Sequence, residues 1–155
     1  MAGYRLVYRR FAGAPLEARA EGRFNRVAEG RTTYLSLTRR MARLEVARRW
    51  GMVAANRAAY VEFEVPLRLR RVVDLTGAAT ASALGVSRET LTGPDLTPCQ
   101  GLATRLRAGG VEGILTWSAA DPDGKNLVVF LDQIDPASSV GPPVALGIGE
   151  EGSER

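Results

Sequence analysis

The stretch YLSLTRRMARLE, residues 34–45, joins the end of a short β pattern to the beginning of a helix. The threonine- and tyrosine-containing segment TTYLS (32–36) favours a strand. The apolar spacing of residues 37–50 predicts an amphipathic helix, and Gly51 is expected to end it. The sequence therefore predicts a strand at 32–36 that leads directly into a helix at 37–50, and the rest of the fold is interpreted from this pair of elements.

One acid in this stretch does not follow the pattern of a surface helix. Glu45 comes four residues after Met41, so it lies at the rim of the apolar row rather than on the polar face. It either pairs with Arg48 or Arg49 along the helix or faces a cleft, and the helical pattern leaves both interpretations open.

Short strands and helices alternate irregularly along the rest of the chain. Apolar alternation predicts a strand at 60–65 that Pro66 ends. The regular strand–helix–strand rhythm of a doubly wound sheet is missing, so the pattern favours the α+β class. The other predicted strands are 4–11, 71–75, 113–117 and 126–134, with a helical turn at 80–84.

The strongest local helix signal is TPCQGLATRLRAGG, residues 97–110. Thr97 is expected to be the N-cap, with Pro98 at the first helical position and Gln100 completing a capping box. Gly109 and Gly110 are expected to end this helix.

At 155 residues the chain is long enough for one domain with a substantial core. We expect residues 1–135 to form a catalytic domain and residues 136–155 a polar, flexible C-terminal tail, because Pro, Gly, Ser and Glu dominate there. Residues 12–33 have weak periodicity and form a long connection, and long ordered connections are often functional.

The chain contains no histidine, and this absence limits the possible catalytic mechanisms more than the presence of any other residue does. It excludes Ser-His-Asp and Cys-His mechanisms and the usual zinc sites, and no metal is expected. A catalytic mechanism in this chain must use Glu, Asp, Ser, Tyr and Arg.

Cysteine content and hydropathy indicate the compartment. The single cysteine, Cys99, forms no internal disulfide and is expected in the core, which suits a reducing cytoplasm. No segment approaches the roughly 18 apolar residues of a membrane span, and the N-terminus has no signal-peptide core. The expectation is a cytoplasmic protein without a membrane contact.

The net charge of +4 results from 21 basic and 17 acidic residues, and all the basic residues except Lys125 are arginines. Arginine is the fork-shaped donor that suits phosphate groups. Basic residues interleaved with aromatic ones are not seen, so direct binding to nucleic acid is not expected. No Gly-rich phosphate-binding loop of the known patterns occurs.

Several residues occupy positions that allow either a structural or a chemical role. They are Arg5 on the first strand, Arg23 and Phe24 within GRFN (22–25), Tyr34, Glu45, Ser118 after a buried strand, and Asn126 at the start of the next strand. Taken singly, each has an ordinary interpretation: a solvated arginine, an edge-strand tyrosine, a surface acid or a turn residue.

The order and spacing of these residues resemble the RES domain family, which is named for its Arg, Glu and Ser. The similar features are GRFN, Tyr-Leu-Ser and Glu45 at nearly regular intervals, followed much later by a strand with Ser-Ala and by NLVVF (126–130). The resemblance covers roughly residues 4–134. Many relatives have Gly-Gly-Arg-Trp-Asn where this chain has EGRFN, so that Phe24 keeps an aromatic plane.

The resemblance implies an ADP-ribosyltransferase-like fold, with a split and mostly antiparallel β core flanked by helices. It also implies cleavage of NAD, as substrate, at the nicotinamide–ribose bond. Glu45, Tyr34, Arg23 and Ser118 would be the catalytic set, and Arg5, Asn126 and Phe24 would bind substrate. In this chemistry Glu45 would stabilise the developing positive charge of the ribose, which explains an acid that faces a cleft.

The resemblance also implies a biological context. The family includes toxins of toxin–antitoxin pairs, and the partner would be an Xre-type helix-turn-helix antitoxin. Two alternatives stay open: a protein ADP-ribosyltransferase, and a non-catalytic partner-binding module on the same fold. A homodimer is compatible with the sequence.

Overall fold

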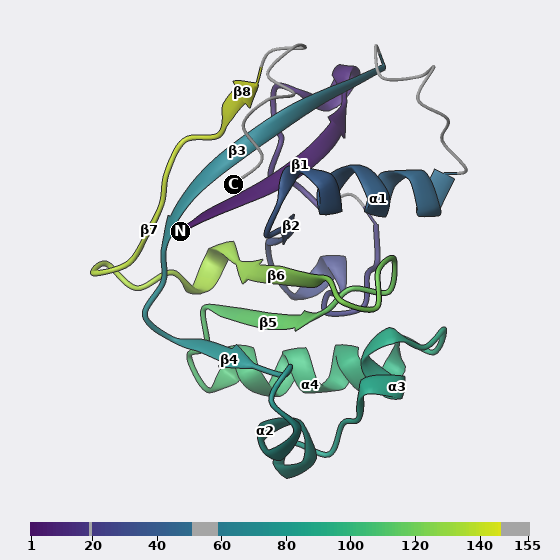
Figure 1. The fold of residues 1–155 in the computed structure, drawn as a ribbon. Coiled ribbons are helices and arrows are strands. Elements are labelled where there is room, and N and C mark those ends of the chain that lie inside the picture. The colour runs from purple at the N-terminus through teal and green to yellow at the C-terminus, as the bar shows by residue number, and fades with distance from the viewer. Residues whose placement is uncertain (19, 51–58, 147–155) are drawn as a thin grey trace.

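The computed structural model describes residues 1–18, 20–50 and 59–146, apart from the side chains of residues 48–50. One eight-stranded sheet has the order β4-β5-β6-β2-β1-β3-β7, and β8 also pairs with β3 (Figure 1). The strands are β1 (Ala2–Tyr8), β2 (Thr32–Ser36), β3 (Tyr60–Arg68), β4 (Val72–Asp74), β5 (Gly113–Trp117), β6 (Lys125–Phe130), β7 (Ser139–Val140) and β8 (Val144–Leu146).

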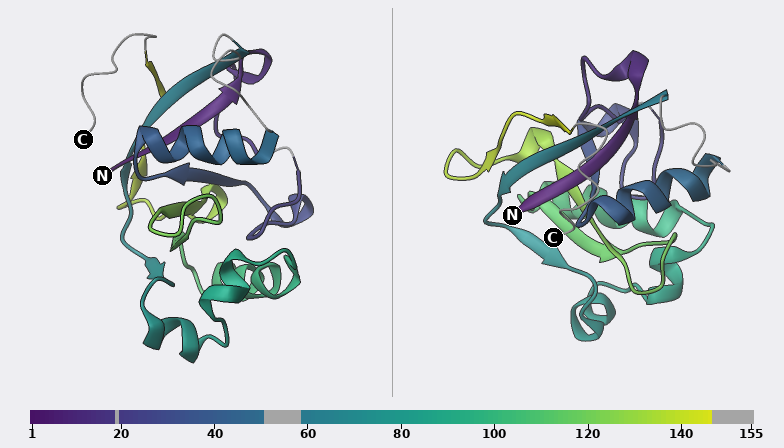
Figure 2. Two further views of the ribbon diagram at one scale, coloured as in Figure 1. Left: turned by 45° about the vertical axis from the view of Figure 1, so that its right-hand side comes forward. Right: turned by 45° about the horizontal axis from the view of Figure 1, so that its top comes forward.

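The helices are interspersed among these strands. They are α1 (Arg39–Trp50), α2 (Ala78–Ala83), α3 (Arg88–Thr92) and α4 (Thr97–Ala108), with short 3-10 turns η1 (Arg9–Phe11), η2 (Val27–Glu29) and η4 (Leu131–Gln133). Figures 1 and 2 show α1 beside β1 and β2, whereas α2, α3 and α4 gather at the other end of the molecule, next to β4 and β5.

The sheet is mostly antiparallel and nearly divides in the middle. Among the strand pairs of the described residues, only β4 and β5 run parallel. Strands β1 and β2 are joined at a single register position, Tyr4 opposite Ser36, whereas β1 pairs with β3 along its whole length. The β1–β2 junction is therefore the place where the two halves of the sheet separate.

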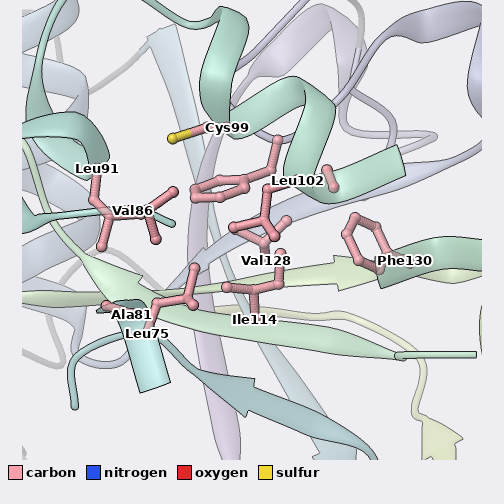
Figure 3. Close-up of a cluster of buried hydrophobic side chains, with 11 residues drawn as sticks. Leu75, Ala81, Val86, Leu91, Cys99, Leu102, Ile114, Val128 and Phe130 are labelled. Atoms are coloured by element: carbon pink, nitrogen blue, oxygen red, sulfur yellow. The ribbon is translucent and has the colours of Figure 1, made fainter. Parts of the chain in front are cut away.

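A first hydrophobic cluster fills the half of the molecule that carries α2, α3 and α4. Cys99 and Leu102 of α4 face Ile114 of β5 and Val128 of β6 (Figure 3). Burying side chains of this size stabilises the fold by about 1.5–3 kcal/mol each. The expectation that Cys99 is a core residue is confirmed, since the side chain is fully buried.

A second cluster lies on the opposite face of β2 and β6 and also includes residues of β3, because successive side chains of a strand point to opposite faces. It contains Leu35, Val65, Leu67, Leu127 and Val129. Strand β6 therefore has apolar side chains on both faces, which explains its continuous apolar run in the sequence.

The structure confirms the predicted strands at 32–36 and 113–117. The prediction that Pro66 ends the strand from residue 60 is wrong, since β3 continues to Arg68. Proline lacks an N–H, but the Pro66 carbonyl accepts a hydrogen bond from the Gly141 amide, and the next residue, Leu67, donates to the Met1 carbonyl.

The expectation of a flexible tail from residue 136 is wrong for residues 139–146. Strand β7 pairs with Leu67 and Arg68, and β8 pairs with Glu62–Glu64. These short strands lack a clear apolar pattern, so tertiary pairing with β3 overrides the turn-rich composition. Residues 147–155 lie outside the described residues, as does Gly51, the expected end of α1.

The capping prediction for α4 is also wrong. The N-cap is Leu96, Thr97 is already inside the helix, and its amide donates to Asp95 Oδ1 at 3.1 Å. The Gln100 side chain makes no capping box: its Nε2 donates instead to the Gly22 carbonyl at 3.0 Å. Helix α3 was not predicted from the sequence, and Ser87 caps it by accepting a hydrogen bond from the Thr90 amide.

Candidate functional site

A cavity of about 590 Å³ lies between β1, the loop after η1 and helix α1. Its size is within the range of small-molecule sites. Polar lining residues meet at the β1–β2 junction, and aromatic residues lie at the far end of β1. The lining includes Tyr4, Arg5, Leu6, Tyr8, Arg10, Phe11, Glu17, Glu21, Gly22, Tyr34, Ser36, Glu45, Tyr60 and Asn126.

The Glu45 carboxylate lines this cavity and is held from two sides. Ser118 Oγ donates a hydrogen bond to Glu45 Oε1, and Asn126 Nδ2 donates to the same oxygen at 2.8 Å. Glu45 comes from α1, whereas Ser118 follows β5 and Asn126 is in β6. Three elements thus fix the carboxylate at the cavity wall.

Ser118 has no proton left for nucleophilic chemistry. Its Oγ accepts hydrogen bonds from the Ala120 amide at 3.0 Å and the Asp121 amide at 3.4 Å. Since a hydroxyl has a single proton, donation to Glu45 uses its only donor. The side chain is 3% exposed, so Ser118 positions Glu45 from beneath the surface.

Asn126 is placed by the sheet. In the ladder it lies opposite Ser36 of β2 on one side and Thr116 of β5 on the other. Its Oδ1 atom is buried and has no hydrogen-bond partner among the described residues. The amide is therefore oriented by its bond to Glu45.

Tyr34 supports the cavity wall with its hydroxyl. The hydroxyl donates to Asn25 Oδ1 at 2.6 Å and accepts from the Phe24 amide at 2.9 Å. A Cβ atom on Gly22 would lie 2.6 Å from the same hydroxyl, so a glycine is required for this close approach. Tyr34 thus ties the 22–25 turn to β2.

Arg5 occupies the gap where β1 and β2 separate. Its Nη1 donates to Thr33 Oγ1 at 3.0 Å and to the Tyr34 carbonyl at 3.3 Å, and its Nη2 donates to the Glu17 carbonyl at 3.2 Å. These bonds link β1 to β2 where the two strands share a single register position. The guanidinium places a permanent positive charge on the cavity wall.

Three of the sequence-predicted residues do not line the cavity: Arg23, Phe24 and Ser118. Arg23 Nη1 donates to the Thr90 carbonyl at 3.4 Å, so the side chain points toward α3. Phe24, expected to offer an aromatic plane to a substrate, is 1% exposed and packs in the first hydrophobic cluster. The structure therefore brings together Arg5, Tyr34, Glu45 and Asn126, with Ser118 behind Glu45.

Comparison with known sequences identifies the family. The sequence model of the RES domain matches residues 2–147. The chain belongs to the RES domain family. No match is found among curated proteins.

A solved structure supports the fold of this RES domain. The chain is similar to a crystal structure of the M. tuberculosis MbcT–MbcA toxin–antitoxin complex, with a TM-score of 0.74 and 23% identity. The match covers 94% of this chain and 83% of that chain. The ADP-ribosyltransferase-like α+β fold, with a mostly antiparallel sheet flanked by helices, is confirmed.

Several residues that complete the site of this RES domain were not predicted from the sequence. Gln100 holds the 22–25 turn through the Gly22 carbonyl, and Ser36 lines the cavity beside Asn126. The aromatic residues Tyr8, Phe11 and Tyr60 line its far end. The aromatic residues near both ends of β1 could have pointed to this part of the site from the sequence. Tyr8 and Tyr60 come together, however, only because β1 pairs with β3.

The described residues contain no group of three or more His, Cys, Asp or Glu side chains arranged to hold a metal ion. Within the same residues, no helix is long and apolar enough to cross a membrane. The sequence also allowed Glu45 to pair with Arg48 or Arg49, but the side chains of these two arginines are outside the described part of the structure.

Proposed function

We propose that this RES domain cleaves NAD at the bond between nicotinamide and ribose. The observation that supports the proposal is the Glu45 carboxylate, fixed by Ser118 and Asn126 at the wall of a cavity that also contains the Arg5 guanidinium. A fixed negative charge beside a phosphate-binding cation suits a substrate with a reactive ribose and a pyrophosphate.

In this reaction the bond from ribose C1′ to the nicotinamide nitrogen breaks, and nicotinamide leaves with the electron pair as a neutral molecule. The ribose becomes oxocarbenium-like and carries the positive charge. Glu45 stabilises that charge, and water or another nucleophile then forms the new bond to C1′ and loses its proton to the carboxylate or to solvent. No acid has to protonate the leaving group.

The fixed position of the carboxylate contributes to the proposed catalysis. Both hydrogen bonds end on Glu45 Oε1, so the group is oriented before substrate arrives. A preorganised charge needs little reorganisation when positive charge develops, and this is usually the largest single contribution to catalysis of this type. Ser118 and Asn126 act as positioning groups in this proposal.

Arg5 is the better placed of the two arginines for the pyrophosphate, because it lines the cavity whereas Arg23 reaches Thr90. Tyr34 lies between Arg5 and the 22–25 turn and offers a ring surface for the nicotinamide ribose. In this proposal Arg23 supports α3 through its contact with Thr90 and does not hold the substrate.

The test is to incubate the purified protein with NAD and follow nicotinamide release with and without phosphate. Release that phosphate stimulates indicates phosphorolysis, and release without that stimulation indicates hydrolysis. Transfer of label from the adenine-labelled dinucleotide to a protein indicates an ADP-ribosyltransferase. No release at any concentration of folded protein would contradict the proposal and favour the non-catalytic binding module.

We also propose that the chain is a cytoplasmic toxin that an antitoxin, such as an Xre-type helix-turn-helix protein, neutralises. The support is family membership and the similarity to a chain from a toxin–antitoxin complex. Induced expression should stop bacterial growth and lower cellular NAD, and co-expression of the gene adjacent to this one should restore both. Unchanged growth and NAD at high expression would contradict the toxin role.

A further inference from the structure

The cavity has a second end that the proposed cleavage does not use. Tyr8 at the end of β1 and Tyr60 at the start of β3 lie opposite each other in the ladder, and their rings stack with centroids 4.7 Å apart. Phe11 of η1 lines the same end. The Tyr60 ring is deeply buried, and this burial, together with a hydrogen bond to Tyr8, raises the pKa of Tyr60 to about 12.

Arg10 shows what kind of group fits between these rings. Its guanidinium carbon lies 5.4 Å from the Tyr8 ring centre and 4.8 Å from the Phe11 ring centre. A guanidinium is flat and delocalised, so a slot that accepts it between two aromatic faces also accepts a flat heterocycle.

The distance between the two ends suits a dinucleotide. Tyr4 lies beside Ser36 at the acidic end, and Tyr8 lies four residues further along the same strand. Four residues of strand span about 13 Å. Arg5 and Glu45 line the same cavity as the aromatic residues, so a guanidinium and a carboxylate are available for the other parts of a dinucleotide.

We propose that the aromatic cluster of Tyr8, Phe11 and Tyr60 binds the adenine base of the dinucleotide, with adenine stacked in the slot where the Arg10 guanidinium lies. This inference rests on the proposed function, because it assigns the second half of the same substrate. It makes Phe11 and Tyr8 specificity-determining residues: they recognise the base and do not take part in bond cleavage. Adenine displaces the Arg10 guanidinium from the slot, and the displaced side chain contributes a positive charge beside the adenosine phosphate.

The test compares two variants of Phe11, which is half-buried in a short 3-10 turn. Phe11→Leu keeps apolar volume but removes the aromatic face, and Phe11→Tyr keeps the face. Base stacking on an aromatic side chain has an effect of about 10-fold on affinity. Phe11→Leu should therefore raise KM for NAD about 10-fold with kcat within about two-fold, and Phe11→Tyr should keep the wild-type KM.

Two substrates and a binding measurement separate this inference from the cleavage proposal. Nicotinamide mononucleotide lacks adenine, so wild type and Phe11→Leu should cleave it with the same kcat/KM. Adenosine monophosphate, followed by calorimetry, should bind wild type and Phe11→Tyr and lose about 10-fold in affinity with Phe11→Leu.

Equal losses on both substrates, or adenosine monophosphate binding that does not depend on Phe11, would overturn the adenine assignment. Absence of nicotinamide release from wild type would reject the cleavage proposal. The binding measurement would then still decide whether the aromatic cluster takes adenine.

Discussion

At the scale of single residues, the Glu45 carboxylate accepts two hydrogen bonds on one oxygen, from partners 73 and 81 residues away in the chain. The Ser118 hydroxyl is fully used, because it accepts from two backbone amides and donates its proton to Glu45. A serine in this state orients a carboxylate and is a poor nucleophile. The roles of the two residues therefore differ, and substitutions should separate them.

Glu45→Gln should lower kcat for nicotinamide release by on the order of 10²-fold or more, because the neutral amide has nearly the same shape but stabilises no positive charge. The KM for NAD should change little. Steady-state kinetics measure both, and Glu89→Gln, on the exposed surface of α3, is the control. Activity at the wild-type level in the Glu45 variant would remove this residue from the mechanism.

Ser118→Ala should reduce kcat by about 10-fold, the usual cost of losing a group that orients a reacting residue. The carboxylate remains in place through Asn126, so the loss should be smaller than that of Glu45→Gln. Ser82→Ala, at an exposed position of α2, is the matched control for a serine substitution. A Ser118 variant as inactive as the Glu45 variant would point to a direct role for the hydroxyl.

At the scale of elements, helix α4 holds the 22–25 turn although the two are far apart in the sequence. Gln100 Nε2 donates to the Gly22 carbonyl at 3.0 Å, and the Tyr34 hydroxyl bridges Asn25 and Phe24. The Phe24 side chain then fills the first hydrophobic cluster, which anchors the turn. The wall of the cavity beside Tyr34 thus depends on packing against a helix that does not itself line the cavity.

Gly22→Ala tests this dependence. The added Cβ would lie 2.6 Å from the Tyr34 hydroxyl and 2.5 Å from Asn25 Oδ1, so the turn must move. We expect the free energy of unfolding to fall by about 1–3 kcal/mol, as for other overpacked sites, with a lower kcat. Denaturant unfolding measures the first effect and nicotinamide release the second.

Gly13→Ala is the control in the same long connection, because its Cβ would have no atom within 4 Å. Equal stability of the two variants would show that the contact with Tyr34 is not a constraint.

At the scale of the whole molecule, the fully buried Glu112 joins segments that precede β4 to segments that follow η4. Its carboxylate accepts hydrogen bonds from the Arg70, Arg71 and Asp135 amides and from Ser138 Oγ. Burial by itself raises the pKa of this carboxyl, but the hydrogen bonds outweigh it and lower the pKa from 4.5 to about 2. The charged form therefore stabilises the folded state.

The pH dependence of stability follows from the direction of this shift. A depressed pKa in the folded state gives stability that is present above pH 4.5 and is lost as the pH falls toward about 2. Glu112→Gln should lower the free energy of unfolding at pH 7 by about 3 kcal/mol and flatten its decline between these pH values. Urea unfolding at a series of pH values measures both, and parallel pH curves for the two proteins would contradict the assignment.

The fold could be predicted in part because each secondary-structure element has its own periodicity. The strands at 32–36 and 113–117 and the position of Glu45 at the rim of α1 follow from spacing within one element. Strands β7 and β8 could not be predicted, because their stability comes from pairing with β3 rather than from an apolar pattern. The capping box predicted at Gln100 was wrong for the same reason: the side chain bonds to the Gly22 carbonyl, 78 residues away in the chain, and not to its own helix.

The sequence by itself determined the α+β class, the exclusion of histidine chemistry and the family, because composition, local periodicity and motif order are properties of the chain. Only the tertiary structure decided which residues share the cavity. It brought Ser118 and Asn126 to Glu45, placed Arg5 in the gap between β1 and β2, and turned Arg23 and Phe24 away from the lining. The physical reason is that these contacts depend on the strand order β6-β2-β1-β3, which local pattern does not encode.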